Sequence, residues 1–194
     1  MDATRTTLLA RLKDRADEGA WRTFDTLYRA MLVGYARSRG LAQADAEDVG
    51  QQCSQVVLER IGDYQHLGSF KSWLRSIAEH KIADQFRRRR GEVQADTAIL
   101  REHEDRSGPG AEEWERHWSS AHLRYCAELV RHDVAETTYA AFVGYAIEGR
   151  APADVAASLK MTPNQVYVAK HRVIERIRAV MLELTGEDLT GSPA

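Results

Sequence analysis

Residues 69–90 read SFKSWLRSIAEHKIADQFRRRR, and their apolar side chains recur at intervals of three and four residues. That spacing predicts an amphipathic α-helix, because 3.6 residues complete one helical turn. Ser69 stands just before the first apolar residue, where its hydroxyl suits the N-cap. The predicted apolar face comprises Phe70, Trp73, Leu74, Ile77, Ala78, Ile82 and Phe86.

The end of this predicted helix is strongly basic. Residues 81–90 hold Lys81 and four consecutive arginines against one acid, Asp84, whereas residues 91–115 hold eight acids against two arginines. Trp73 lies at the rim of the apolar face, and an aromatic beside dense positive charge suits the bases and backbone of an opened nucleic acid. A core helix with a solvated basic end is the alternative, because cations favour any helix C-terminus.

Other segments repeat the helical pattern, and none shows the alternation of a strand. Gly40 and Gly149 stop two of the predicted helices, and acids at 45–48 open another, where the helix dipole favours them. We therefore predict an all-α fold. The expected helices cover about residues 4–17, 21–40, 45–61, 69–90, 114–129, 139–147, 152–159 and 163–184.

Two helical domains are expected, joined by a flexible acidic linker. The helical periodicity lapses after Gly91, and Ser107-Gly108-Pro109-Gly110 is typical of flexible chain. The predicted parts are a first domain at 1–90, a linker at 91–112, a second domain at 113–185 and a tail at 186–194.

Composition excludes several classes of protein. The chain has 194 residues, a net charge of -2 and no apolar run near the ~20 residues of a membrane span. Its N-terminus lacks the pattern of a signal peptide, so we expect a cytoplasmic protein without membrane insertion. Cys53 and Cys126 lie in no metal-binding spacing and are expected to be reduced, structural thiols. No metal or other cofactor is expected, since no ligand motif occurs.

A helix-turn-helix is predicted near the C-terminus. Pro152 opens a short helix, Lys160-Met161 turns the chain, and Thr162-Pro163 caps and opens a second helix. Ala156 precedes Val166 by ten residues, which suits the tight crossing of such helices. Polar side chains on the second helix could read base edges or hold phosphates. An ordinary helical hairpin is the alternative.

The two halves together resemble the extracytoplasmic-function (ECF) sigma factors of bacterial RNA polymerase, over residues 17–90 and 111–184. The run DAEDV at 45–49, with Gln51, is similar to the family's run that docks on the clamp helices of the largest polymerase subunit. GSFKSWLR at 68–75 is similar to the family's run that is followed by a basic helix. In the family, that helix melts and reads the minus-ten element of the promoter. VYVAKHRVIERI at 166–177 resembles the recognition helix of sigma domain four, which reads the minus-35 element.

The resemblance implies three groups of site residues and no catalytic residue. Those expected to bind polymerase are Asp45, Glu47, Asp48, Gln51, Gln52 and Gln55. Those expected at the minus-ten element are Tyr64, His66, Ser69, Phe70, Lys71, Trp73, His80, Lys81, Asp84, Arg87, Arg88, Arg89 and Arg90. Those expected at the minus-35 element are Thr162, Asn164, Gln165, Tyr167, Lys170, His171 and Arg172.

The resemblance also implies the function. It predicts a transcription initiation factor that brings core RNA polymerase to promoter DNA and opens it, with an anti-sigma factor or another regulator as a further partner. The first domain would then be sigma domain two and the second sigma domain four. A DNA-binding regulator that is no polymerase subunit is the alternative. An all-α enzyme is a third hypothesis, which the sequence disfavours because it shows no paired carboxylates, phosphate loop or metal motif.

Overall fold

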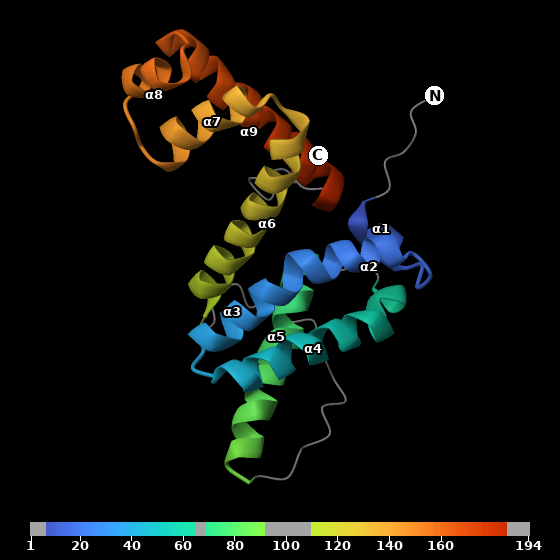
Figure 1. The fold of residues 1–194 in the computed structure, drawn as a ribbon. Helices are drawn as coiled ribbons and strands as arrows, with labels where there is room; N and C mark the ends of the chain where they lie inside the picture. The colour runs from blue at the N-terminus through green and yellow to red at the C-terminus, as the bar shows by residue number, and fades with distance from the viewer. Residues whose placement is uncertain (1–6, 65–68, 92–109, 186–194) are drawn as a thin grey trace. The chain divides into compact units, whose positions relative to one another are not determined.

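A computed structural model describes residues 7–64, 69–91 and 110–185 (Figure 1). These residues form helices and no strand, which confirms the predicted all-α class. By their internal contacts they divide into two compact units, one of residues Leu8–Ala121 and one that begins at His122. No helix among the described residues is long and apolar enough to cross a membrane.

In the first unit, two helices differ from the sequence prediction. Residues 4–6 of the helix expected at 4–17 lie outside the described residues, and the described part is helical only in α1. The helix expected at 21–40 contains a π-helical turn, η1, between α2 and α3. Asp17 caps α2 by accepting from the backbone of Ala20 at 2.9 Å and also pairs with Arg11 at 2.9 Å. The bounds are α1 Leu8–Leu12, α2 Glu18–Phe24, η1 Asp25–Arg29, α3 Ala30–Ser38, α4 Gln43–Arg60, the 3-10 turn η2 Ile61–Asp63, and α5 Phe70–Arg89.

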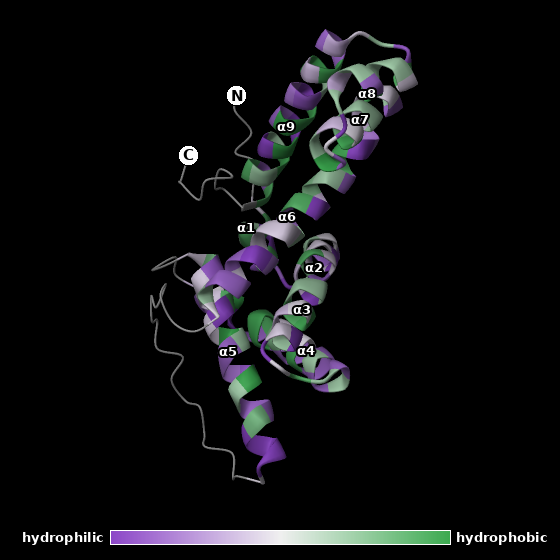
Figure 2. Cartoon of the chain, turned by 90° about the vertical axis from the view of Figure 1, so that its left-hand side faces the viewer, coloured by the Kyte–Doolittle hydropathy of each residue, from purple (hydrophilic) through white to green (hydrophobic). Residues whose placement is uncertain are grey.

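The core of the first unit lies between α3, α4 and α5, which pack against one another. Most of the apolar faces predicted for these helices are buried, and Trp73 and Phe86 lie half-buried at the edge of α5. In Figure 2 apolar residues alternate with polar ones along α5, which is hydrophilic at its C-terminal end. Side chains at most 3% exposed include Phe24, Leu27, Tyr28, Met31, Leu32, Tyr35, Val49, Cys53, Val57, Ile61, Leu74, Ile77, Ala78 and Ile82.

The second unit is also helical, and α6 contributes to both units. The residues of α6 from 122 onward pack with α9, and the first residues of α6 belong to the first unit. A π-helical turn, η3, follows α7 where the sequence predicted one uniform helix. The bounds are α6 Ala111–Asp133, α7 Glu136–Phe142, η3 Val143–Ile147, α8 Pro152–Leu159 and α9 Pro163–Thr185.

The helix-turn-helix is confirmed as α8 and α9. Ala156 and Val166 lie in one buried cluster with Ala141, Val155 and Ala169, as their spacing predicted. Lys160 makes the turn in the left-handed conformation, with φ 55°. That conformation is usual for glycine and costs a residue with a Cβ some strain, so a lysine here is uncommon.

Both cysteines are buried and unpaired, as expected of structural thiols. Burial raises the pKa of Cys53 to about 12 and that of Cys126 to about 11. Because the thiolate is the reactive form, both side chains are inert at neutral pH.

Candidate nucleic-acid interface

The basic end of α5 is only partly available to a partner. Arg87 forms an ion pair with Asp84, which is 4% exposed, and Arg89 pairs with Asp45 of α4. Arg88 and Arg90 are exposed, and neither has an acidic partner among the described residues. The predicted run of four arginines therefore offers two open charges and two that the protein itself neutralises.

Aromatic rings gather at the start of α5. Tyr64 and Trp73 are half-buried, with ring centroids 5.1 Å apart and planes tilted by 34°. Phe70 packs between Trp73 and Tyr28 at 5.6 and 5.7 Å and is 6% exposed. Tyr64 and Trp73 thus border the solvent, whereas Phe70 belongs to the core.

Two residues expected at the minus-ten element lie in the interior instead. Phe70 sits on the buried face of α5, and Asp84 continues that face two turns after Ile77. Neither presents its side chain to solvent in this structure, so a direct contact with a DNA strand is not available to them here. His66 lies outside the described residues, and Ser69 caps α5 by accepting from the backbone of Ser72 at 3.2 Å.

Lys71 is engaged by the first turns of α6. It pairs with Glu115 and lies 5.9 Å from the ring centroid of Trp118. Trp118 in turn packs on Tyr28 at 5.3 Å, and Trp114 packs on Tyr35 at 5.0 Å. The start of α6 therefore covers the aromatic cluster of the first unit.

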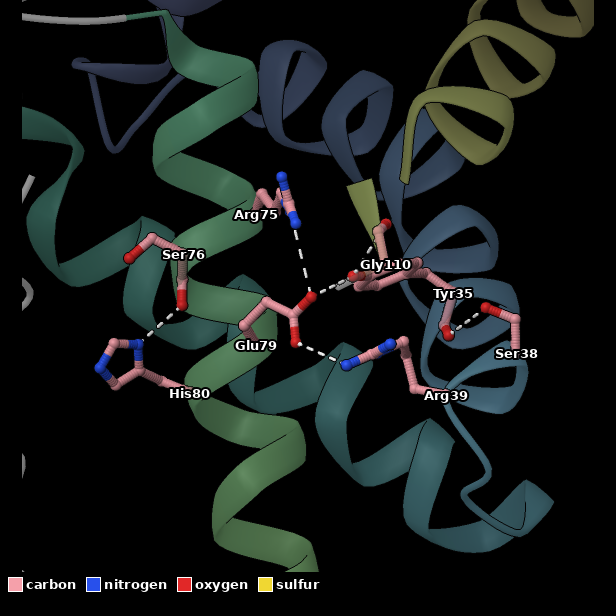
Figure 3. A network of polar contacts seen from close by, with 8 residues as sticks. All are labelled: Tyr35, Ser38, Arg39, Arg75, Ser76, Glu79, His80 and Gly110. Carbon is pink, nitrogen blue, oxygen red and sulfur yellow. Dashed lines mark hydrogen bonds and ion pairs between the residues drawn. The ribbon is translucent and has the colours of Figure 1, made fainter. Parts of the chain in front are cut away.

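A polar network that sequence reasoning missed joins α3, α5 and the residue before α6 (Figure 3). The hydroxyl of Tyr35 donates to Glu79 and lies 3.4 Å from the carbonyl oxygen of Gly110. Arg39 and Arg75 reach the same carboxylate at 3.7 and 4.0 Å. Burial and the nearby Glu79 raise the pKa of Tyr35. No periodic pattern signals such a network, because its members come from separate helices.

Gly110 fits this network because it has no side chain. Its φ is +87°, and a Cβ there would lie 2.8 Å from the Tyr35 hydroxyl and 2.9 Å from a guanidinium nitrogen of Arg39. Next to the network, His80 directs Nδ1 to the carbonyl of Ser76 at 2.9 Å. Its Nε2 is therefore the ring nitrogen left for an outside partner.

The polar face predicted to bind polymerase is present on α4. Its members Glu47, Asp48, Gln51 and Gln55 are exposed, whereas Asp45 and Gln52 are half-buried. Gln55 donates to Glu59 at 3.1 Å along the same face. The pair between Asp45 and Arg89 links this face to the basic end of α5.

On α9, the predicted reading residues occupy the first three turns. All are exposed except Lys170, which is half-buried. Thr162 and Gln165 form a reciprocal cap: the Thr162 backbone donates to Oε1 of Gln165 at 2.7 Å, and the Gln165 backbone donates to Oγ1 of Thr162 at 3.3 Å. The exposed members are Thr162, Asn164, Gln165, Tyr167, His171 and Arg172.

Tyr145 of η3 was not singled out from the sequence, yet it contacts two of these residues. Its ring meets that of Tyr167 edge-on at 5.3 Å, and Nζ of Lys170 lies 5.4 Å from its centroid. The described residues hold no group of three or more His, Cys, Asp or Glu side chains that could bind a metal ion.

A family model and a curated relative point to one family. The family model "Sigma-70 region 2" matches residues 24–92. The ECF RNA polymerase sigma factor ShbA of Streptomyces griseus subsp. griseus is 30% identical over 188 residues, which cover 90% of this chain and 96% of that protein. The solved structure of CnrH in complex with the cytosolic domain of CnrY is 20% identical, covers 90% of this chain and 94% of that one, and has a TM-score of 0.37.

Proposed function

The chain belongs to the ECF sigma factors of bacterial RNA polymerase, and from this premise we propose how its own residues divide the work of promoter recognition. It functions as an RNA polymerase sigma factor, with core polymerase and promoter DNA as partners. In the proposal the first unit is sigma domain two and the second is sigma domain four. A cytoplasmic location and control by an anti-sigma factor or another regulator are further parts of the proposal.

The proposal rests on one observation above all: a single chain carries both an aromatic-edged basic helix, α5, and a helix-turn-helix, α8 and α9. Stacking rings and cations suit a single strand, whereas a helix-turn-helix suits a duplex groove. A sigma factor needs both, because it opens one promoter element and reads the other as duplex. A regulator that is no polymerase subunit would need only the second.

At the minus-ten element, we assign stacking to Tyr64 and Trp73 and phosphate contacts to the open cations. Both rings border the solvent, and every base offers a π-face to them. Arg88 and Arg90 provide charge that no described acid neutralises. His80 and Lys81, both half-buried, lie between the rings and the arginines along α5.

At the minus-35 element, we assign base reading to the first turns of α9, which enter the major groove in helix-turn-helix docking. Asn164, Gln165 and His171 are the exposed amides and imidazole there. Arg172 lies further along and is assigned a phosphate contact. Polymerase docking is assigned to the exposed polar face of α4.

Run-off transcription tests the function. The full chain and bacterial core polymerase, incubated with promoters found by mapping transcript starts after overexpression, should yield transcripts that core polymerase alone does not make. Binding of the chain to the same DNA without transcript formation would favour the regulator. A chain that neither binds core polymerase nor directs any transcript would overturn the proposal.

A further inference from the structure

The flank of the recognition helix α9 rests on an aromatic residue from outside the helix-turn-helix. Tyr145 belongs to η3, which contacts both α8 and α9. It is half-buried at the edge of the cluster formed by Ala141, Val155, Ala156, Val166 and Ala169. Its inner side is therefore fixed by the core, and its remaining surface meets Tyr167 and Lys170.

The π-helical turn places Tyr145 at this position. A π-turn adds one residue to a helical turn, so the side chains that follow it point in new directions. Gly144 lets the turn approach α8 closely, since a Cβ there would lie 3.1 Å from Cγ2 of Val155. The backbone of Glu148 donates to Val143 and that of Arg150 to Gly144, at 2.9 and 3.0 Å, which closes the turn.

The contacts of Tyr145 are directional. Its ring meets the Tyr167 ring at 83° and 5.3 Å, an edge-to-face arrangement. Nζ of Lys170 lies 5.4 Å from the ring centroid, within the range of a cation–π interaction. No acidic side chain among the described residues pairs with Lys170, unlike Lys71 or Arg89. The charge of Lys170 is thus oriented by the ring but not neutralised.

We propose that Tyr145 is a positioning residue for promoter reading, whose ring holds Lys170 toward a phosphate beside the element read by α9 and fixes the plane of Tyr167. Lys170 and Tyr167 lie one turn apart on the flank of α9, next to the exposed face that carries Asn164 and His171. Phosphate contacts set the register in which base contacts are made. This inference rests on the proposed function and adds to it a residue outside the recognition helix.

The test measures promoter binding of the holoenzyme, full chain with core polymerase, at several salt concentrations. Tyr145→Leu should lower affinity roughly twofold to fivefold, the scale of an exposed cation–π contact. It should also lower the slope of log affinity against log salt by about 0.9, the value of one phosphate contact. Tyr145→Phe keeps the ring and should retain the parent slope.

A double-mutant cycle shows whether Tyr145 acts through Lys170. Lys170→Ala alone should lower the slope as Tyr145→Leu does, and the double variant should lower it no further. Tyr139→Leu is the matched control: Tyr139 packs on Phe142 in the neighbouring cluster, with centroids 6.0 Å apart. It should lower the melting temperature and leave the salt slope unchanged.

An unchanged slope for Tyr145→Leu, or an additive loss in the double variant, would overturn the inference. If Tyr145→Leu does not fold, a ring-fluorinated phenylalanine at position 145 keeps the ring's volume but removes its negative face, and the same loss of slope is expected. If the parent holoenzyme transcribes, and Lys170→Ala lowers the salt slope while Tyr145→Leu does not, the inference is contradicted and the proposed function is not. A parent chain that directs no transcription contradicts the proposed function as well.

Discussion

Gln165 caps α9, and the same side-chain amide is the one proposed above to read a base. Its Oε1 accepts from the Thr162 backbone at 2.7 Å and closes the N-terminus of α9. Its Nε2 remains available as a donor, but bidentate reading of adenine needs the amide's donor and acceptor together. Because Oε1 already accepts a hydrogen bond from the backbone, it is less free to accept a second one from a base.

This double use can be separated by substitution. Gln165→Glu keeps an acceptor at the cap and should retain the melting temperature, while losing the amide donor. Gln165→Ala removes both and should cost about 1 kcal/mol of stability, the usual net value of one hydrogen bond. Both variants should change the preferred upstream base, by ~1–3 kcal/mol of discrimination if the parent contact is bidentate. Selection from a randomised upstream element and thermal unfolding measure the two effects.

Arg172→Ala is the comparison for this experiment. Arg172 is exposed two turns further along α9, where a phosphate contact would weaken binding to all sequences alike. If Gln165→Ala leaves the selected motif unaltered while Arg172→Ala changes it, the orientation of α9 assigned above is wrong.

At the scale of one helix, α5 combines the stabilising ion pair of Arg87 and Asp84 with two exposed arginines that have no described acidic partner. Arg88→Ala with Arg90→Ala should flatten the salt dependence of promoter binding by roughly one slope unit for each phosphate that the arginines neutralise. The melting temperature should hardly change, because both residues are exposed without a described acidic partner. Salt titration of holoenzyme binding measures this.

Arg87→Ala is the matched control on the same turn. It leaves Asp84, 4% exposed, without its partner and should destabilise the protein by about 1–3 kcal/mol. Its effect on the salt slope should be smaller than that of the double variant. An identical slope for parent and double variant would mean that Arg88 and Arg90 merely face solvent.

Helix α4 allows an equally direct test. Charge reversal at Asp48 with Gln51→Ala should weaken core-polymerase binding and leave helicity intact, because both residues are exposed opposite the buried Val49 and Cys53. Asp63→Lys, with the same charge change at an exposed site in η2, is the control and should bind as the parent does. Equal core affinity of parent and Asp48 variant in a pull-down titration would remove α4 from the interface.

The sequence predicted which face of each helix is buried better than it predicted which side chains contact one another. Apolar spacing identified the buried side of α5, and the cap and proline signals placed α8 and α9, because these are local effects. It did not reveal the π-turns, since apolar periodicity tolerates one extra residue. Burial of Asp84 depends on pairing with Arg87, and the ring contact of Tyr145 depends on tertiary packing. The cap by Gln165 could have been found, because Thr-Pro-Asn-Gln matches the capping-box pattern.

For the molecule as a whole, the main new feature is the first part of α6. Residues 111–121 belong to the first compact unit, although the sequence placed a domain boundary after 112. Trp114 and Trp118, four residues apart, predicted a helix, but periodicity does not say which surface a helical face will cover. The boundaries that the sequence predicts for sigma domains two and four stay a prediction.

Trp114 is the residue to change here. It is 2% exposed and packs on Tyr35, so Trp114→Ala should lower the free energy of unfolding by about 3–5 kcal/mol. Its indole nitrogen is buried with no hydrogen-bond partner among the described residues, so Trp114→Phe loses no hydrogen bond and should cost much less. Denaturant unfolding measures both.

Truncation gives an independent check of the same feature. A chain ending after Ala121 should unfold cooperatively, whereas one ending after Gly91 should expose Tyr28 and Tyr35 and melt at lower temperature. Equal stability of the two truncated chains would show that the start of α6 adds nothing to the first unit.

The contact of Gly110 with Tyr35 also holds the point at which the described chain resumes after Gly91. Gly91 and Gly110 lie in the same compact unit, so the described chain leaves that unit at Gly91 and resumes in it at Gly110. The entropy of loop closure grows with the logarithm of length, and doubling the loop costs only about 0.6 kcal/mol. Residues inserted between these two glycines should therefore cost little stability, whereas any side chain at position 110 would press on the Tyr35 hydroxyl and weaken this contact.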